Sequence, residues 1–383
     1  MQIRPFTIKI TDEILLDLRG RLERTRWPDE IMGAGWDYGF PVEKLHHLID
    51  YWIHQFDWRV TERRINTFPN FHAEVDGMGI HFVHQRGQGP DPMPLLILHG
   101  WPSTFYEMLD LLPLLTDPVS AGDDPQITFD VVIPSIPGHG FSDRPVQPAF
   151  EDRKSAELLV SLMQGLGYSR FGIHAYDLGA SIAGLLCLDF PGQVIGYHTS
   201  SPGNPSPQLE KDGASLSPAE RDYLSYLEQW SRDEYGYGHL LSTRPQTIAY
   251  ALNDSPVGLA AWILEKWQVW TDPNGNLEDY YNWDDLLAIV MIYWVTQTIN
   301  SANRFYYEGR HTRWPGPGEH SNVPHGVALP ATQTFERPPR EYVERLFPDI
   351  RQWVEMQRGG HFLALQEPHL LAEAIRSFFT LFR

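Results

Sequence analysis

The chain has 383 residues, 42% of them hydrophobic and 21% charged, so it can bury a sizeable core and is not a disordered protein. Its net charge of −19 disfavours nucleic acid and anionic membranes as partners. The single cysteine, Cys187, excludes an intrachain disulfide, and no run of about 18 apolar residues predicts a transmembrane helix. No apolar signal core follows Met1, and this absence favours a cytoplasmic protein. A truncated chain that had lost an N-terminal anchor would have the same pattern.

The N-terminal part of the chain has the pattern of helices followed by a hairpin. Apolar periodicity predicts one helix over about 10–30 and a second over about 42–56. Two short strands are predicted within 71–84, around an Asp-Gly turn. We expect residues 1–85 to form an N-terminal extension packed on a core.

Short apolar strands then alternate with helical segments. The predicted strands are Leu95–Leu98, Phe129–Pro134, Phe171–Tyr176 and Val194–His198, followed after a gap by Gly326–Leu329 and Trp353–Met356. This alternation predicts an α/β fold, with a mostly parallel sheet and helices on both faces. Residues 201–303 read almost entirely as helix and predict a cap over the carboxyl ends of the strands. The core is therefore expected in two parts, 86–200 and 304–383, with a final helix near the C-terminus.

The strongest local motif is Ala175-Tyr176-Asp177-Leu178-Gly179-Ala180. A strand ends, one residue occupies a sharp turn, and a helix begins between small residues, which is the spacing of the nucleophile elbow of an α/β-hydrolase. The elbow residue is Asp177 rather than serine. A carboxylate attacks sp³ carbon and leaves an ester, so epoxides or alkyl halides are the expected substrates. An ordinary aspartate at a helix N-terminus is the alternative for this motif alone.

Two further segments fit the same fold. His99-Gly100-Trp101-Pro102 follows a buried strand, where this fold places one backbone donor of its oxyanion hole. The predicted donors are the N–H groups of Trp101 and Leu178. His361, in Arg358-Gly359-Gly360-His361-Phe362, lies late in the chain, as the order of nucleophile, acid and histidine requires.

With these motifs the whole chain resembles the microsomal-type epoxide hydrolases, including the juvenile-hormone members. The resemblance also includes several segments outside the core motifs: Arg26-Trp27-Pro28, Phe56-Asp57-Trp58-Arg59, Ile80-His81-Phe82, and the cap run from Thr243-Arg244-Pro245 through Asn253-Asp254-Ser255-Pro256-Val257-Gly258-Leu259. It implies an epoxide as substrate and a vicinal diol as product, and the aromatic share of 13% favours an apolar epoxide. No metal-ligand spacing or phosphate loop indicates a metal or cofactor. A homodimer is an option for the assembly.

The resemblance also implies two cap tyrosines that hydrogen-bond the epoxide oxygen. The matching positions are Tyr237 and Tyr306, whose phenols can donate to a developing alkoxide. Their neighbours Tyr235 and Tyr307 are alternatives. In the implied mechanism Asp177 opens the epoxide, and water activated by His361 hydrolyses the ester.

The chain departs from the family where the acid partner of His361 is expected. Counting forward from Gly326 reaches Gln333, and counting back from His361 reaches Thr334, neither of which is acidic. Glu336 is the nearest carboxylate and is the candidate catalytic acid; a carboxylate from elsewhere, or Gln333 itself, is the alternative. The acid matters because it orients the histidine and stabilises the imidazolium.

Two other functions remain as alternatives at this point. A haloalkane dehalogenase would share the aspartate nucleophile, but it commonly has an indole beside it, where this chain has Leu178. A binding protein that kept the fold and lost turnover would account for the missing acid, but not for the nucleophile, histidine and tyrosines.

Overall fold

The computed structural model describes residues 1–117, 127–202, 215–316, 318–331 and 335–383. The strands are β1 (Ile3–Pro5), β2 (Asn70–Val75), β3 (Met78–Gln85), β4 (Met93–Leu98), β5 (Phe129–Pro134), β6 (Phe171–Ala175), β7 (Val194–Thr199), β8 (His325–Leu329) and β9 (Ile350–Glu355). They form one sheet in the order β1-β2-β3-β5-β4-β6-β7-β8-β9. Strands β4 to β9 are parallel, whereas β1, β2 and β3 add to the β5 edge as an antiparallel unit.

Side chains of the central strand β4 enter two different cores. Leu95 and Ile97 join the cluster that contains helices α4 (Leu111–Thr116) and α15 (Pro368–Thr380). Leu96 and Leu98 join the cluster of α5 (Asp152–Gly165) and α6 (Asp177–Asp189). Because successive residues of a strand point to opposite faces, this split puts helices on both faces of the sheet. The predicted α/β-hydrolase fold is confirmed.

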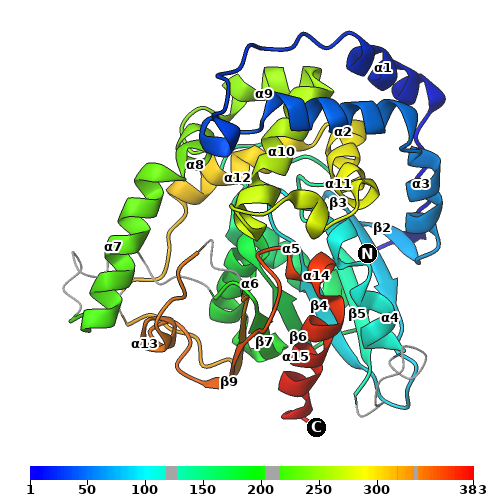
Figure 1. Cartoon of the computed structure of the whole chain (residues 1–383). Coiled ribbons are helices and arrows are strands. Elements are labelled where there is room, and N and C mark those ends of the chain that lie inside the picture. The colour runs from blue at the N-terminus through cyan, green and yellow to red at the C-terminus, as the bar shows by residue number, and fades with distance from the viewer. Residues whose placement is uncertain (118–126, 203–214, 317, 332–334) are drawn as a thin grey trace.

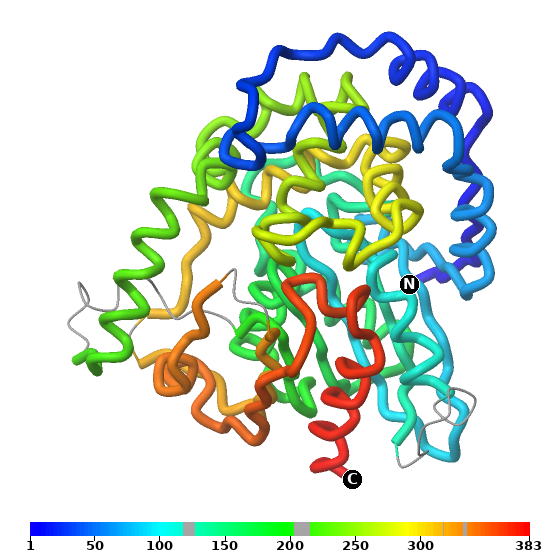
Figure 2. Tube along the Cα trace, in the orientation of Figure 1, coloured from blue at the N-terminus to red at the C-terminus, as the bar shows by residue number. Residues whose placement is uncertain are grey.

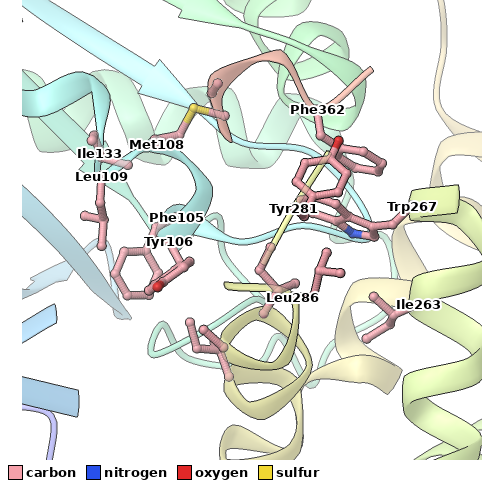
Figure 3. Packing of buried hydrophobic residues seen from close by; sticks show 14 of the residues in the cluster. Phe105, Tyr106, Met108, Leu109, Ile133, Ile263, Trp267, Tyr281, Leu286 and Phe362 are labelled. Atoms are coloured by element: carbon pink, nitrogen blue, oxygen red, sulfur yellow. The ribbon is translucent and has the colours of Figure 1, made fainter. Parts of the chain in front are cut away.

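A helical cap lies over the carboxyl ends of the strands (Figure 1). Its helices are α7 (Pro218–Asp233), α8 (Gly236–Leu241), α9 (Pro245–Asp254), α10 (Pro256–Thr271), α11 (Trp283–Thr296) and α12 (Ile299–His311). A cluster of large apolar side chains joins cap and core, and Figure 3 shows Trp267 of α10 beside Phe362. These two rings stack with centroids 3.7 Å apart, which fixes the chain next to His361 against the cap.

The N-terminal helices α1 (Asp12–Glu23), α2 (Val42–His54) and α3 (Trp58–Asn66) lie along the outside of the cap (Figures 1 and 2). Polar contacts tie each of them to cap helices or the loops between them. They are Arg21 to Asp254 at 2.7 Å, Lys44 to Asn276 at 2.8 Å, Tyr51 to Asp284 at 2.9 Å and Arg64 to Asp285 at 2.9 Å. The extension therefore joins the sheet through its strands and the cap through its helices.

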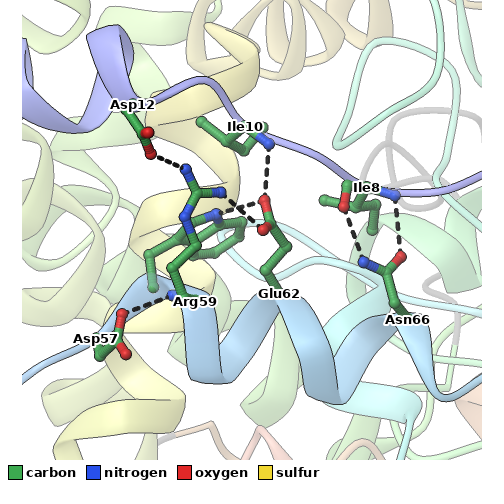
Figure 4. Close-up of polar contacts among 8 residues, drawn as sticks. Ile8, Ile10, Asp12, Asp57, Arg59, Glu62 and Asn66 are labelled. Carbon is green, nitrogen blue, oxygen red and sulfur yellow. Dashed lines mark hydrogen bonds and ion pairs between the residues drawn. The ribbon is translucent and has the colours of Figure 1, made fainter.

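Inside the extension, Glu62 gathers its own set of donors (Figure 4). Its carboxylate accepts from the backbone N–H of Ile10 at 2.7 Å, from the Trp58 indole at 3.2 Å and from Arg59 at 2.7 Å. Each buried oxygen is thereby paired, as a buried carboxylate requires. This network holds the segment before α1 against α3.

Several predicted boundaries were wrong. The first helix ends at Glu23 rather than near residue 30, since Arg24-Thr25-Arg26 adds no apolar residue to the buried face. The strand predicted to begin at Trp353 begins at Ile350, and the one predicted to end at Tyr176 ends at Ala175. Strand β1 was not predicted, because its three residues are stabilised only by pairing with β2.

Candidate active site

Asp177 lies at the turn between β6 and α6 with φ of +50°, the left-handed region that a non-glycine residue rarely adopts. Close packing around the turn requires small neighbours. A Cβ on Gly179 would lie 2.6 Å from the backbone oxygen of His99, so strand and helix can approach only because this residue is glycine. The turn raises the carboxylate of Asp177 above the end of the sheet, and 20% of this side chain is exposed.

The two predicted oxyanion donors both reach Asp177. The backbone N–H of Trp101 donates to Asp177 Oδ1 at 2.8 Å, and the N–H of Leu178 donates to the same oxygen at 2.6 Å. Gly100 permits this approach, because a Cβ there would lie 2.4 Å from the Cβ of Asp177. Two donors on one oxygen stabilise negative charge on that oxygen and leave Oδ2 free to react.

His361 faces the free oxygen of Asp177. Its Nε2 lies 3.4 Å from Asp177 Oδ2, and its side chain is only 8% exposed. The backbone N–H of His361 donates to the carbonyl of Trp270 at 3.1 Å, which anchors the loop to the cap helix α10. The imidazole is enclosed by aromatic rings with centroids 5.0–5.3 Å away: Tyr176, Trp270, Phe335 and Phe362.

Tyr237 of α8 and Tyr306 of α12 come together over Trp101. The Tyr237 ring stacks on the indole at 5.3 Å with a 4° interplanar angle, and Tyr306 meets it edge-on at 5.2 Å. The two phenol rings are 5.8 Å apart. Burial raises the pKa of both tyrosines well above the ordinary value, so both hold their protons at neutral pH.

The alternative tyrosines lie differently. Tyr235 lines the same cavity and packs edge-on against Tyr237 at 5.1 Å, and burial raises its pKa to about 12. Tyr307 is 39% exposed and packs on His311, away from the cavity. Of the two neighbours on α12, Tyr306 lines the cavity and Tyr307 does not. Tyr235 lines the cavity together with Tyr237.

Asp177, His361 and both cap tyrosines line one cavity of about 630 Å³. Its walls are largely aromatic, with contributions from Tyr226, Trp230, Trp270, Phe305, Trp314 and Phe335. Arg310, Trp314 and Glu336 line the cavity and are also exposed to solvent. These three residues therefore mark the mouth, on the side of α7 and of residues 335–338.

The structure does not join Glu336 to His361. Glu336 is exposed at the cavity mouth, and its backbone hydrogen-bonds to Tyr226 of α7. Among the described residues, no hydrogen bond or ion pair links the Glu336 carboxylate to the imidazole. Gln333 and Thr334, the two positions reached by counting, lie outside the described residues.

Three buried polar residues near Asp177 were not found from sequence. Tyr176 donates a hydrogen bond from its hydroxyl to Glu107, and Asp152 lines the cavity. Burial raises the pKa of Glu107 to about 8 and that of Asp152 to about 7. Within the described ranges, no cluster of three or more His, Cys, Asp or Glu side chains could hold a metal ion, and no helix could cross a membrane.

Comparison with known proteins agrees with this geometry. Residues 3–108 match the family model described as epoxide hydrolase N terminus, and residues 93–251 match that of the alpha/beta hydrolase fold. The chain is 35% identical to epoxide hydrolase 1 of Sus scrofa over 414 aligned positions, covering 99% of this chain and 89% of that protein. The chain belongs to the microsomal-type epoxide hydrolase family.

Solved structures extend the likeness of this epoxide hydrolase to three dimensions. The crystal structure of juvenile hormone epoxide hydrolase from the silkworm Bombyx mori superposes with a TM-score of 0.86 at 28% identity, covering 100% of this chain and 94% of the other. The epoxide hydrolase of Aspergillus niger gives a TM-score of 0.83 at 28% identity, covering 100% and 97%. The extension, core and cap of this epoxide hydrolase are thus shared over the full length of the described chain.

Proposed function

We propose that this epoxide hydrolase works through a covalent ester on Asp177. The observation that carries the proposal is the unequal environment of the two carboxylate oxygens: Oδ1 accepts from two backbone N–H groups, and Oδ2 faces the cavity beside His361. Oδ2 attacks one epoxide carbon, the carbon–oxygen bond of the ring breaks, and its electron pair moves to the oxygen. Tyr237 and Tyr306 hydrogen-bond this alkoxide and supply a proton.

The second half-reaction hydrolyses the ester. His361 Nε2 takes a proton from water, whose oxygen bonds to the ester carbonyl carbon, and the electron pair moves onto Oδ1 between the N–H groups of Trp101 and Leu178. Collapse of this intermediate breaks the bond between the carbonyl carbon and Oδ2, which leaves with the diol and takes the proton back from His361. The second water proton remains on the Asp177 carboxyl group; its loss, and the return of one proton to the tyrosine that protonated the alkoxide, restore both groups. One diol oxygen therefore comes from Asp177.

The expected substrate is a bulky apolar epoxide. A cavity of about 630 Å³ has room for more than a small alkyl epoxide, and its walls are mainly aromatic. Neither rival gains support from the site. Position 178 is leucine rather than an indole donor, and the carboxylate, imidazole and two phenols of a hydrolase all line one cavity.

A single-turnover experiment in ¹⁸O-water tests the ester route. With enzyme in excess over styrene oxide, the first diol should carry no label, because its new oxygen comes from Asp177; over many turnovers the diol should become labelled. Asp177→Asn should form no ester, as read from the mass of the acid-quenched protein. Labelled diol in the first turnover would contradict the covalent route, and absence of any diol would favour a binding protein.

A further inference from the structure

His361 needs a partner that orients its ring and offsets the positive charge it gains. Within the described part of the chain, Asp177 is the carboxylate within ion-pair distance of the imidazole, at 3.4 Å. This charge disappears once Asp177 becomes an ester, at the stage when His361 must take a proton from water. The hydrolytic step therefore requires a negative group other than Asp177 and, from its exposed position, other than Glu336.

Tyr176 connects His361 to a second buried carboxylate. Its ring packs edge-on against the imidazole, with centroids 5.3 Å apart and an interplanar angle of 65°. Its hydroxyl donates a hydrogen bond to Glu107 Oε2. Both side chains are buried, and Glu107 belongs to the 3-10 helix η2 (Phe105–Met108), which follows the oxyanion loop. The chain of contacts runs from Glu107 through Tyr176 to His361.

A buried carboxyl group at this position lowers the stability of the fold, so we expect it to have a function. Burial in an apolar site disfavours the ionised form, and no Arg or Lys pairs with Glu107 among the described residues. Packing alone would be served better by an apolar side chain, since the surrounding cluster consists of Phe105, Met108 and their neighbours. The carboxyl of Glu107 is thus unexplained by the packing around it.

The charges around Glu107 link its ionisation to the state of Asp177. The titratable groups that face it are Tyr176, Asp177 and Tyr281. Burial raises the pKa of Glu107 to about 8, and the negative charge of Asp177 contributes to this shift in the same direction. Forming the ester removes that charge, so Glu107 ionises more readily just when His361 becomes cationic.

We propose that Glu107, acting through Tyr176, is the positioning residue that holds and electrostatically supports His361 during ester hydrolysis. This inference rests on the ester mechanism proposed above. Tyr176 fixes the plane of the imidazole, and Glu107 holds the phenol by its hydroxyl. The pair takes the place of the acid that the segment after β8 does not provide among its described residues.

The test separates the two half-reactions in the full-length enzyme. Excess Glu107→Gln or Tyr176→Phe enzyme is mixed rapidly with styrene oxide, and ester and diol are followed by intact-protein mass and by chromatography. Ester formation should stay within about threefold of wild type. Hydrolysis should slow by about 10- to 100-fold, the range that one hydrogen bond to a charged group provides, so that ester accumulates. The pH profile of hydrolysis should shift in both variants.

Glu62→Gln is the matched control, because it neutralises a buried carboxylate of the extension that is not among the residues lining the cavity, and it should leave both rates unchanged. If Glu107→Gln does not fold, as judged by thermal melting, Tyr176→Phe carries the test because it retains the ring. Hydrolysis at the wild-type rate in both variants overturns the inference, as does ester accumulation in Glu336→Gln but not in Glu107→Gln. Absence of ester in every variant and in wild type instead contradicts the ester mechanism itself.

Discussion

Lowering the pH from about 7.5 to about 5 should destabilise this protein through its buried histidines. Burial lowers the pKa of five fully buried histidines to about 3 or 4: His81, His99, His139, His174 and His325. It lowers the pKa of His84 and His198 as well, and these two add to the effect in the same direction. In the unfolded chain each has a pKa near 6.5. Below that pH the unfolded chain binds protons that the folded protein does not, so stability falls as the pH falls.

The size of the effect follows from these values. At about pH 5 each histidine costs about 2 kcal/mol, so the five together cost about 10 kcal/mol. Glu107 and Asp152 act in the opposite direction, because their pKa values are raised to about 8 and about 7 and the penalty of burying their charge is relieved on acidification. That relief is about 6 kcal/mol, leaving a net loss of at least about 4 kcal/mol, to which His84 and His198 add. A typical domain has only about 5–15 kcal/mol of stability in total, so the loss is large.

Urea unfolding followed by tryptophan fluorescence at the two pH values measures this loss. A single substitution makes the test specific. His325→Gln should reduce the difference in unfolding free energy between the two pH values by about 2 kcal/mol, because it removes one group that binds a proton at about pH 5 only in the unfolded chain. Glutamine keeps a donor for the Tyr197 carbonyl that His325 contacts at 3.0 Å. His47→Gln, at an exposed position, should leave the difference unchanged. Equal or greater stability at about pH 5 in the wild type would refute the reasoning.

Other predictions concern the site. Tyr237→Phe and Tyr306→Phe should each slow ester formation by about 10- to 100-fold, and the double variant by clearly more, because each buried phenol provides one hydrogen bond to the alkoxide; equal rates in wild type and double variant would contradict their role. Gly100→Ala should reduce ester formation by at least about 100-fold, since its Cβ would lie 2.4 Å from that of Asp177; stopped-flow rates near wild type would show that the loop can move. Asp152→Asn should raise the melting temperature at about pH 8 more than at about pH 4. Burial raises the folded-state pKa of Asp152 to about 7, so the charged form present at about pH 8 is the destabilising one. A larger increase at about pH 4 would mean that the fold stabilises the carboxylate.

Features carried by consecutive residues could be predicted from the sequence. Strand β5 has the predicted bounds, Phe129–Pro134, because a short apolar run is itself the signal for a buried strand. The elbow at Asp177 is equally local. The hydrogen bond between Tyr176 and Glu107 joins residues 69 positions apart, and neither lies in a motif that indicates a partner. Such a contact depends on how η2 packs below the elbow, which periodicity does not encode.

The contacts between the extension and the cap also affect how substrate reaches the Asp177 carboxylate inside the cavity. Four polar contacts spread over α1, α2 and α3 anchor the cap from outside, while Trp267 and Phe362 anchor it from below. Because the cap is anchored on both sides, we expect substrate to enter through the mouth beside α7 rather than by movement of the cap as a whole. Selection of substrates by size then depends on a few rim side chains, such as Trp314, that can be exchanged without moving the reacting groups.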